Sequence, residues 1–231
     1  EVRECLKNFA YGDNRILELS RAYKISLDTG WDVPPGVLHA PASLCTYEPQ
    51  FASDVYAMYQ SVLYYDHCVP ESLLWKNCPD EEIGNYDYLV DVIDWEKNVD
   101  PDFHRNRFMR PLVCRSGEGF VEEWICYKCP IVGAKRLTVA PGATVTVSDG
   151  FAYGMILVQG KGTMNGIKIE TPALIRFDEL TNDEFFVSEK AATAGVTITN
   201  VSDTEPVVIL KHFAENKELT EIVSRIADSD C

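Results

Sequence analysis

Short runs in which apolar and polar residues alternate dominate the chain between residues 108 and 213. Successive side chains of a strand point to opposite faces, so alternating runs about 8 to 12 residues apart, separated by turn residues, are typical of a β-sandwich or jelly-roll barrel. The tail carries Leu219, Ile222, Val223 and Ile226 on one helical stripe, which predicts a closing helix over residues 215–226. The alternation predicts strands at residues 122–129, 134–139, 144–147, 155–159, 167–169, 173–177, 184–187, 196–200 and 207–212.

Two earlier segments, residues 15–25 and 44–65, also have a strand-like composition. They are rich in β-branched and aromatic residues and are bounded by turn residues. Between residues 44 and 50 the polar side chains of Glu48 and Gln50 share one face with Leu44 and Thr46. If that face lines the inside of a barrel, Glu48 and Gln50 face a cavity.

The periodicity changes between residues 70 and 106. Leu89, Val90 and Ile93 stand at helical spacing within residues 86–97, and Pro70 precedes a short helical turn. We interpret this region as a helical connector between two β modules. The expected domains are residues 1–69, 70–106, 107–214 and 215–231: a first β module, the connector, a second β module and a C-terminal helix.

Composition and charge fit an acidic globular protein. The chain has 231 residues, 46% of them hydrophobic, and 21 basic against 36 acidic residues give a net charge of −15. This charge argues against nucleic acid and against an anionic membrane as partner, because both attract basic patches. The longest apolar runs fall far below the roughly 20 residues of a membrane span, and no signal sequence leads the chain, so we expect a cytoplasmic location.

Eight cysteines are too sparse for a small disulfide scaffold, and we expect reduced thiols. Cys126 and Cys129 form a CxxC pair, but no second pair or nearby histidine completes a zinc set, and no thioredoxin-like context surrounds it.

Three stretches resemble cupins. Residues 141–166, PGATVTVSDGFAYGMILVQGKGTMNG, have the Pro-Gly turn, the strands and the V-x-G-x-G turn of a cupin core, and residues 200–206, NVSDTEP, look like the last turn of such proteins. Residues 31–54 resemble the second half of another cupin, and more narrowly the metal-dependent mannose-6-phosphate isomerases. The motifs that carry this narrower resemblance are Pro35-Gly36, His39-Ala40, and Glu48 followed by Ser53-Asp54.

The resemblance implies an all-β fold with two cupin-type jelly-roll barrels, the first incomplete in this chain, joined by a short helical connector. It implies a divalent metal ion (zinc, manganese or iron) with His39 as a metal ligand. Glu48, Gln50 and Asp54 are then the expected substrate-binding residues. The activity implied is aldose–ketose isomerisation of a carbohydrate or sugar phosphate, with no catalytic residue assigned.

Departures from the family pattern keep an alternative open. Residues 1–30 contain no histidine, and Ala57, Met58 and Tyr59 stand where such isomerases carry an arginine. In the second module, Asp149, Phe151 and Tyr153 occupy positions where histidine ligands are needed. The alternative is a non-catalytic sugar-binding or structural cupin. The expected partners are a sugar or sugar phosphate and either a second copy of the chain or a further segment that completes the first barrel.

Overall fold

The structure is a computed structural model and describes residues 1–52 and 57–229. Its internal contacts divide the chain into two compact units. The first unit comprises residues 1–26, 33–45 and 52–106, and the second comprises residues 27–32, 46–51 and 107–231.

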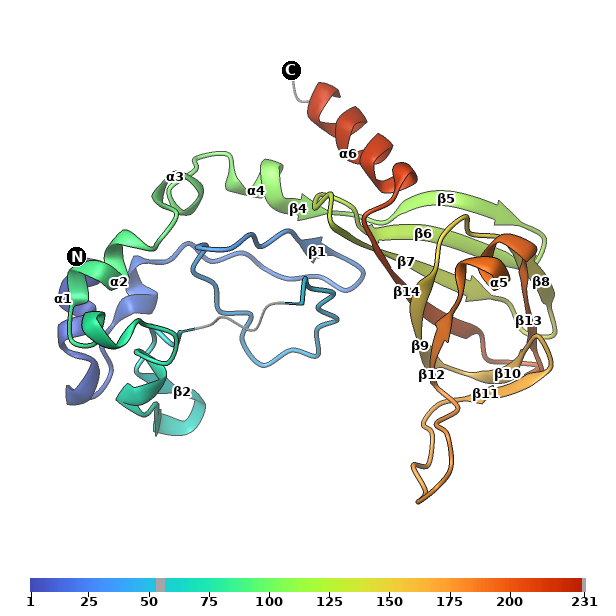
Figure 1. Ribbon diagram of the computed structural model, residues 1–231, viewed down its shortest axis with the longest axis horizontal. Helices are drawn as coiled ribbons and strands as arrows, with labels where there is room; N and C mark the ends of the chain where they lie inside the picture. The colour runs from blue at the N-terminus through green and yellow to red at the C-terminus, as the bar shows by residue number, and fades with distance from the viewer. Residues whose placement is uncertain (53–56, 230–231) are drawn as a thin grey trace. The chain divides into compact units, whose positions relative to one another are not determined.

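The second unit is built on two antiparallel sheets (Figure 1). The larger sheet has the strand order β12-β9-β14-β7-β6-β5, and the smaller has the order β11-β10-β13-β8. The larger sheet consists of β5 (Leu112–Gly117), β6 (Phe120–Cys126), β7 (Val132–Val139), β9 (Tyr153–Gln159), β12 (Glu184–Val187) and β14 (Val207–Ala214). The smaller consists of β8 (Thr144–Val147), β10 (Lys161–Met164), β11 (Ile167–Glu170) and β13 (Val196–Asn200).

Alternating burial along the strands creates one core between these sheets. On β14, every second residue from Val207 to Phe213 is buried, as expected of a strand whose one face meets a second sheet. Leu137 of β7, Ile169 of β11 and Ile198 of β13 belong to the same buried cluster. The helices α5 (Glu189–Ala194) and α6 (Lys217–Ser229) add Ala192, Leu219 and Ile222.

Two glycines let the chain cross from the larger sheet to the smaller one. Gly160 lies between β9 and β10 with φ +90°, and a Cβ atom there would stand 2.4 Å from the carbonyl oxygen of Pro206. A Cβ atom on Gly162 would stand 2.0 Å from the carbonyl oxygen of Thr199. Both distances are far below van der Waals contact, so the V-x-G-x-G turn depends on its glycines.

Most predicted strands of this unit are confirmed, and those at 144–147, 184–187 and 196–200 have the predicted bounds. The strand predicted over residues 173–177 is wrong, because these residues form part of an exposed loop between β11 and β12. The predicted closing helix is confirmed as α6, with Leu219 and Ile222 buried. Helix α5, which begins at the N-cap Ser188, was not anticipated.

A two-stranded ribbon also belongs to the second unit. Its strands β1 (Gly30–Trp31) and β4 (Phe108–Met109) pair antiparallel, and the rings of Trp31 and Phe108 meet edge to face. Asp32 and Arg107 form an ion pair of 2.6 Å beside it.

The first unit contains mostly short helices and irregular chain around its own apolar cluster, which includes Leu6, Phe9, Leu74 and Leu89. The strands predicted over residues 15–25 and 44–65 are wrong for most of their described length. The first segment holds η2 (Ile16–Leu19), and the described residues of the second hold β2 (Val62–Leu63) and the start of η3 (Tyr64–Asp66). The unit's other elements are α1 (Val2–Lys7), η1 (Phe9–Tyr11), β3 (His67–Cys68), η4 (Glu71–Leu73), η5 (Asp80–Glu82), α2 (Tyr86–Asp91) and α3 (Trp95–Asn98), and α4 (Phe103–Arg107) ends at its boundary.

The predicted β class is confirmed: the two extended sheets lie in the second unit and, among the described strands, do not close into barrels. The helical character of residues 70–106 is also confirmed. The single helix expected over residues 86–97 is divided, because the Asp94 carboxylate accepts a hydrogen bond of 3.0 Å from the Lys97 N–H and starts α3. None of the described helices combines the length and apolar character that crossing a bilayer demands.

Candidate functional site

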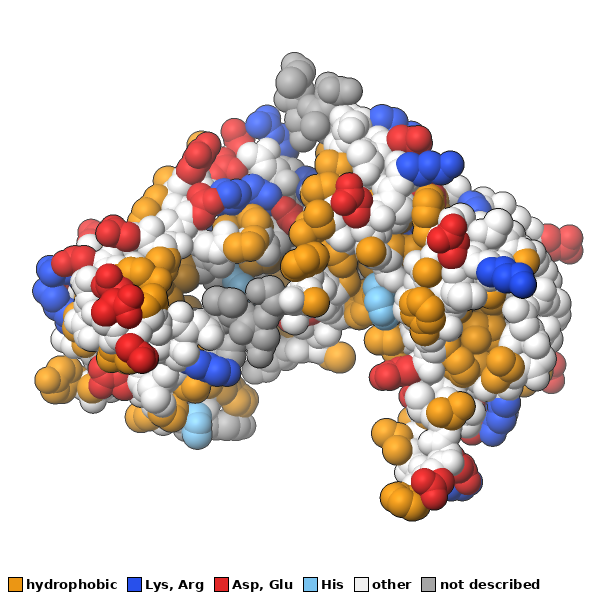
Figure 2. All heavy atoms as spheres, in the orientation of Figure 1, with side chains coloured by type: hydrophobic (Ala, Val, Ile, Leu, Met, Phe, Trp, Pro, Cys, Tyr) orange, Lys and Arg blue, Asp and Glu red, His pale blue; other side chains and the backbone are white. Residues whose placement is uncertain are grey.

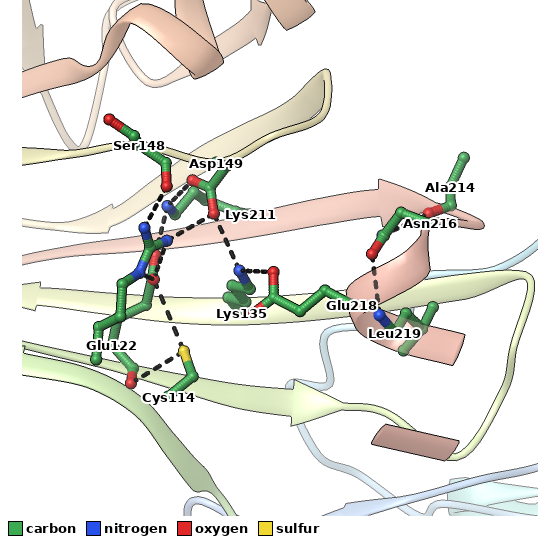
Figure 3. A network of polar contacts seen from close by, with 11 residues as sticks. Cys114, Glu122, Lys135, Ser148, Asp149, Lys211, Ala214, Asn216, Glu218 and Leu219 are labelled. Carbon is green, nitrogen blue, oxygen red and sulfur yellow. Dashed lines mark hydrogen bonds and ion pairs between the residues drawn. The ribbon is translucent and has the colours of Figure 1, made fainter. Parts of the chain in front are cut away.

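Charged side chains from both ends of the second unit's sequence meet in its interior (Figure 3). On β14 the inward face runs Val207, Ile209, Lys211, Phe213, so strand parity directs a lysine into an otherwise apolar core. Lys135 of β7 lies directly opposite Lys211 in the strand register. We call the set the ion cluster; its members are Arg115 (β5), Glu122 (β6), Lys135 (β7), Asp149 (after β8), Lys211 (β14) and Glu218 (α6).

Asp149 joins the two lysines. Its Oδ1 atom lies 3.0 Å from Lys135 Nζ, and its Oδ2 atom lies 2.6 Å from Lys211 Nζ. Both lysines are only 1% exposed. Two cations that face each other across a strand pair repel. The Asp149 carboxylate between them offsets this repulsion and so stabilises the strand register.

The remaining members complete a neutral set of three cations and three carboxylates. Arg115 donates from Nε to Glu122 Oε2 at 2.5 Å and also pairs with Asp149 at 2.6 Å. Glu122 is itself fully buried and pairs with Lys211. Glu218 of α6 accepts from Lys135 Nζ at 3.0 Å, so the cluster also ties the closing helix to the sheet.

Aromatic rings surround the two ammonium groups. Lys135 Nζ lies 4.6 Å from the ring centre of Trp124 and 5.2 Å from that of Phe213. Lys211 Nζ lies 5.0 Å from the ring centre of Tyr153. These cation–π contacts add attraction between the ring faces and the two buried ammonium groups.

The ionisation states follow from this geometry. Burial opposes the charge of Asp149, but Lys211 and Lys135 outweigh it and lower its pKa to about 2. Burial likewise disfavours the charged form of Lys135, yet Asp149, Glu122 and Glu218 raise its pKa above the ordinary value. Burial and, to a smaller degree, Asp149 raise the pKa of Tyr153. The carboxylate stays ionised and Lys135 stays protonated at neutral pH.

A fixed charge state limits the chemistry of the ion cluster. A protonated lysine with its partners in place is neither a nucleophile nor a general base, and Asp149 with a pKa of about 2 does not take up a proton near pH 7. The donor set does not fit a metal ion either, because ammonium groups already occupy the carboxylate oxygens. Across residues 1–52 and 57–229, no three His, Cys, Asp or Glu side chains form a group suited to a metal.

The predicted site residues come from different parts of the chain, and their roles stay predictions. His39 is an exposed residue of the first unit, and its Nδ1 atom lies 3.0 Å from the Val37 carbonyl oxygen. Glu48 and Gln50 belong to the second unit and are exposed, and Glu48 accepts a hydrogen bond of 2.9 Å from Thr46. Asp54 lies outside the described residues.

The segment that carries Glu48 is attached through Tyr47. The Tyr47 hydroxyl lies 3.1 Å from His212 Nδ1 on β14. Gly154 of β9 pairs with His212 in the strand register. A Cβ atom on residue 154 would stand 2.0 Å from the His212 Nε2 atom, so the imidazole occupies the space that a side chain at this position would need. Tyr47, rather than Glu48 or Gln50, is therefore the residue of this segment that the structure fixes.

The CxxC pair shows no sign of an activated thiol. Burial raises the pKa of Cys126 to about 11, the opposite of what a reactive cysteine needs. Cys126 ends β6, whereas Cys129 lies beyond the strand.

A groove of about 470 Å³ opens beside the ion cluster, between β5 and α6. We call it the β5–α6 groove. Its apolar lining includes Leu112, Val113 and Ile222, and its floor includes Trp124. The Trp124 indole N–H is buried and has no hydrogen-bond partner among the described residues.

Comparisons with known proteins give likenesses of fold only. No protein-family model and no curated protein matches the sequence. An RmlC-like cupin from Shewanella frigidimarina is 15% identical with a TM-score of 0.33, and the match covers 47% of this chain and 86% of that one. A Bacillus subtilis oxalate decarboxylase mutant is 18% identical with a TM-score of 0.33, covering 48% of this chain and 30% of that one.

A cupin-2 domain from Rhodospirillum rubrum is 10% identical with a TM-score of 0.31, covering 46% of this chain and 70% of that one. The Shewanella and Rhodospirillum structures are named as cupins. The narrower resemblance to mannose-6-phosphate isomerases stays a prediction.

Proposed function

We propose that this chain is a non-catalytic cupin-type protein whose second unit is a structural module held by ion pairs. The observation that carries the proposal is the position of Asp149, whose two carboxylate oxygens are each taken by a buried lysine. Every charge in the ion cluster has a partner of opposite sign, so the cluster offers no open position to a substrate or metal. A buried set of this kind favours one register of strands over others.

The test compares catalysis with stability. Protein purified without chelator is assayed for isomerisation of mannose 6-phosphate and related sugar phosphates, and its unfolding is followed in urea. We expect no turnover in the wild type and a large loss of stability in Asp149→Asn. A stable Asp149→Asn variant that has lost a measurable isomerase activity contradicts the proposal.

A second candidate function rests on His39. The contact of its Nδ1 atom with the Val37 carbonyl favours the tautomer that leaves Nε2 free to accept, which is how metal-binding histidines are usually oriented. In this candidate His39 is a ligand of a zinc, manganese or iron ion, Glu48, Gln50 and Asp54 contact a sugar or sugar phosphate, and the chain acts as a carbohydrate isomerase in the cytoplasm. No further protein ligand is assigned in this candidate, so we derive no reaction step from it.

Elemental analysis distinguishes the two candidates. The metal content per chain is measured for the wild type, for His39→Ala and for the control His67→Ala, which removes another exposed histidine of the first unit. Near-stoichiometric metal that is lost only in His39→Ala supports the second candidate. Metal below one tenth per chain in all three proteins, with calorimetric sugar binding unchanged in His39→Ala, removes it.

A further inference from the structure

The loop between β11 and β12, residues 171–183, projects from the second unit with apolar side chains exposed (Figures 1 and 2). We call it the arm. Phe177 is 94% exposed, Leu180 93% and Ile175 87%. Single exposed apolar residues are common, but several large ones within a few residues of one loop mark a surface that another surface covers.

The same unit also carries an unfilled apolar surface, the β5–α6 groove. Leu112 and Val113 of β5 form one wall, and Ile222 and Ile226 of α6 form the other. Val113 is 62% exposed although it belongs to a strand of the main sheet. The chain therefore has an apolar projection and an apolar recess of side-chain dimensions.

The arm does not reach the groove of its own chain. It is rooted in β12, at one edge of the six-stranded sheet, whereas the groove lies at β5, the other edge. Five inter-strand steps of about 4.8 Å, about 24 Å measured along the sheet, lie between the two edges. A loop that folds back on itself extends about 20 Å at most, six residues at about 3.3 Å each, and Figure 1 shows the arm directed away from α6.

Charges at the two surfaces are complementary. Arg225 and Glu218 line the groove: Glu218 pairs with Lys135, whereas Arg225 has no ion pair among the side chains that the structure describes, and its Nε donates to the Glu221 carbonyl oxygen at 3.4 Å. Asp178 lies at the tip of the arm between Phe177 and Glu179, and it has no cationic partner in the part of the chain that the structure describes. The net charge of −15 and this acidic tip disfavour insertion of the arm into an anionic membrane.

We propose that the arm occupies the β5–α6 groove of a second copy of this chain. A two-fold axis places each arm in the partner's groove, so both apolar surfaces are covered and the assembly closes at two chains. In this arrangement Asp178 approaches Arg225 of the other chain. The inference extends the expectation of a homo-oligomer by naming its interface, and it does not depend on the proposed function.

Sedimentation velocity over about 1 to 100 μM tests the interface. The arm variant Phe177→Ser/Leu180→Ser and the groove variant Val113→Asp are each expected to raise the dimer dissociation constant at least about tenfold. The matched control is Leu27→Ser, because Leu27 is 95% exposed and lies in the second unit outside both surfaces. Circular dichroism confirms that each variant keeps the wild-type fold.

Mixing the variants tests reciprocity. The arm variant keeps an intact groove and the groove variant keeps an intact arm, so an equimolar mixture is expected to recover part of the association that each has lost alone. A wild type that is monomeric at 100 μM overturns the proposal, as does a dimer that the arm variant leaves unchanged. Binding of the wild type to phosphatidylcholine vesicles that the arm variant abolishes, with no self-association, also overturns it.

Discussion

At the scale of single residues, Asp149 holds the ion cluster together. It separates two buried lysines that the strand register places opposite each other. Replacing it with asparagine keeps the shape but leaves Lys135 and Lys211 without their shared counter-ion. Because removing one partner of a buried ion pair leaves an uncompensated charge, we expect Asp149→Asn to lower the free energy of unfolding by about 3–5 kcal/mol in urea titrations at pH 7.

The same carboxylate gives a pH dependence with a defined sign. Its pKa in the folded protein is about 2, below the ordinary value of 3.8. The stabilisation is therefore complete above pH 3.8 and is lost as the pH falls towards 2, and it amounts to about 2 kcal/mol. We expect the slope of stability against pH in this window to be smaller in Asp149→Asn than in Asp203→Asn, a control at an exposed aspartate. Equal slopes contradict the assignment.

The sequence does contain an indication of the ion cluster: a lysine occupies a buried position on each of two otherwise apolar strand faces. Lys211 stands on the buried face of β14, whose other residues are valine, isoleucine and phenylalanine, and Lys135 stands on the buried face of β7 between glycine and leucine. A lysine at such a position has to find a carboxylate, because burying its charge alone is too costly. Which carboxylate it finds depends on contacts distant in sequence, such as those with Asp149 and Glu218, and local pattern does not reveal these.

Asn200 shows a polar side chain with a structural role in the turn at residues 200–206. Its buried amide donates to the carbonyl oxygens of Val139, Ala140 and Glu205 at 3.1, 3.1 and 2.8 Å. Substitution by alanine leaves these carbonyls without their donor, so we expect Asn200→Ala to lose about 2–3 kcal/mol in urea unfolding. Asn182→Ala serves as the control, since no side-chain hydrogen bond is found for Asn182 within the described residues. A loss no larger than that of the control contradicts this role.

At the scale of elements, the junction between β9 and β10 requires the backbones of two strands to come close. Gly162 faces the Thr199 carbonyl, and a methyl group has no room there. We expect Gly162→Ala to lose about 3 kcal/mol or more in thermal or urea unfolding, because either the ladder or the crossing must shift. Gly150→Ala is the matched control, since a Cβ atom on Gly150 meets nothing within 4 Å. Equal stability of the two variants contradicts the close approach.

Strands were predictable from the sequence where a neighbouring strand of the same chain pairs with them. The strands at 144–147 and 196–200 pair with each other, and alternation alone located both. Residues 15–25 and 44–65 have a similar composition, but strand propensity expresses packing against neighbouring strands. No neighbouring strand is present for most of their described length, and the chain there is irregular or 3₁₀-helical. The prediction that Glu48 and Gln50 share one face of a strand fails for the same reason, because residues 44–50 form no strand.

At the scale of the whole molecule, the net charge affects stability through repulsion between all the like charges of the chain. An excess of fifteen negative charges repels itself in the folded state more than in the expanded unfolded chain. The ion pairs of the interior are screened by salt much less than exposed charges, because water and ions do not reach Lys135 or Asp149. Salt therefore weakens the repulsion while leaving the main attractive pairs in place.

This difference predicts that added salt stabilises the protein. Raising NaCl from about 20 mM to about 300 mM shortens the Debye length to about 6 Å, and we expect the melting temperature to rise by several degrees. Differential scanning calorimetry at fixed pH and fixed protein concentration measures the change, with a concentration series to separate folding from self-association. A melting temperature that falls with salt would mean that exposed ion pairs, such as Arg3 with Asp87, contribute more than the net repulsion. The net repulsion between like charges would then be the smaller of the two electrostatic effects on stability.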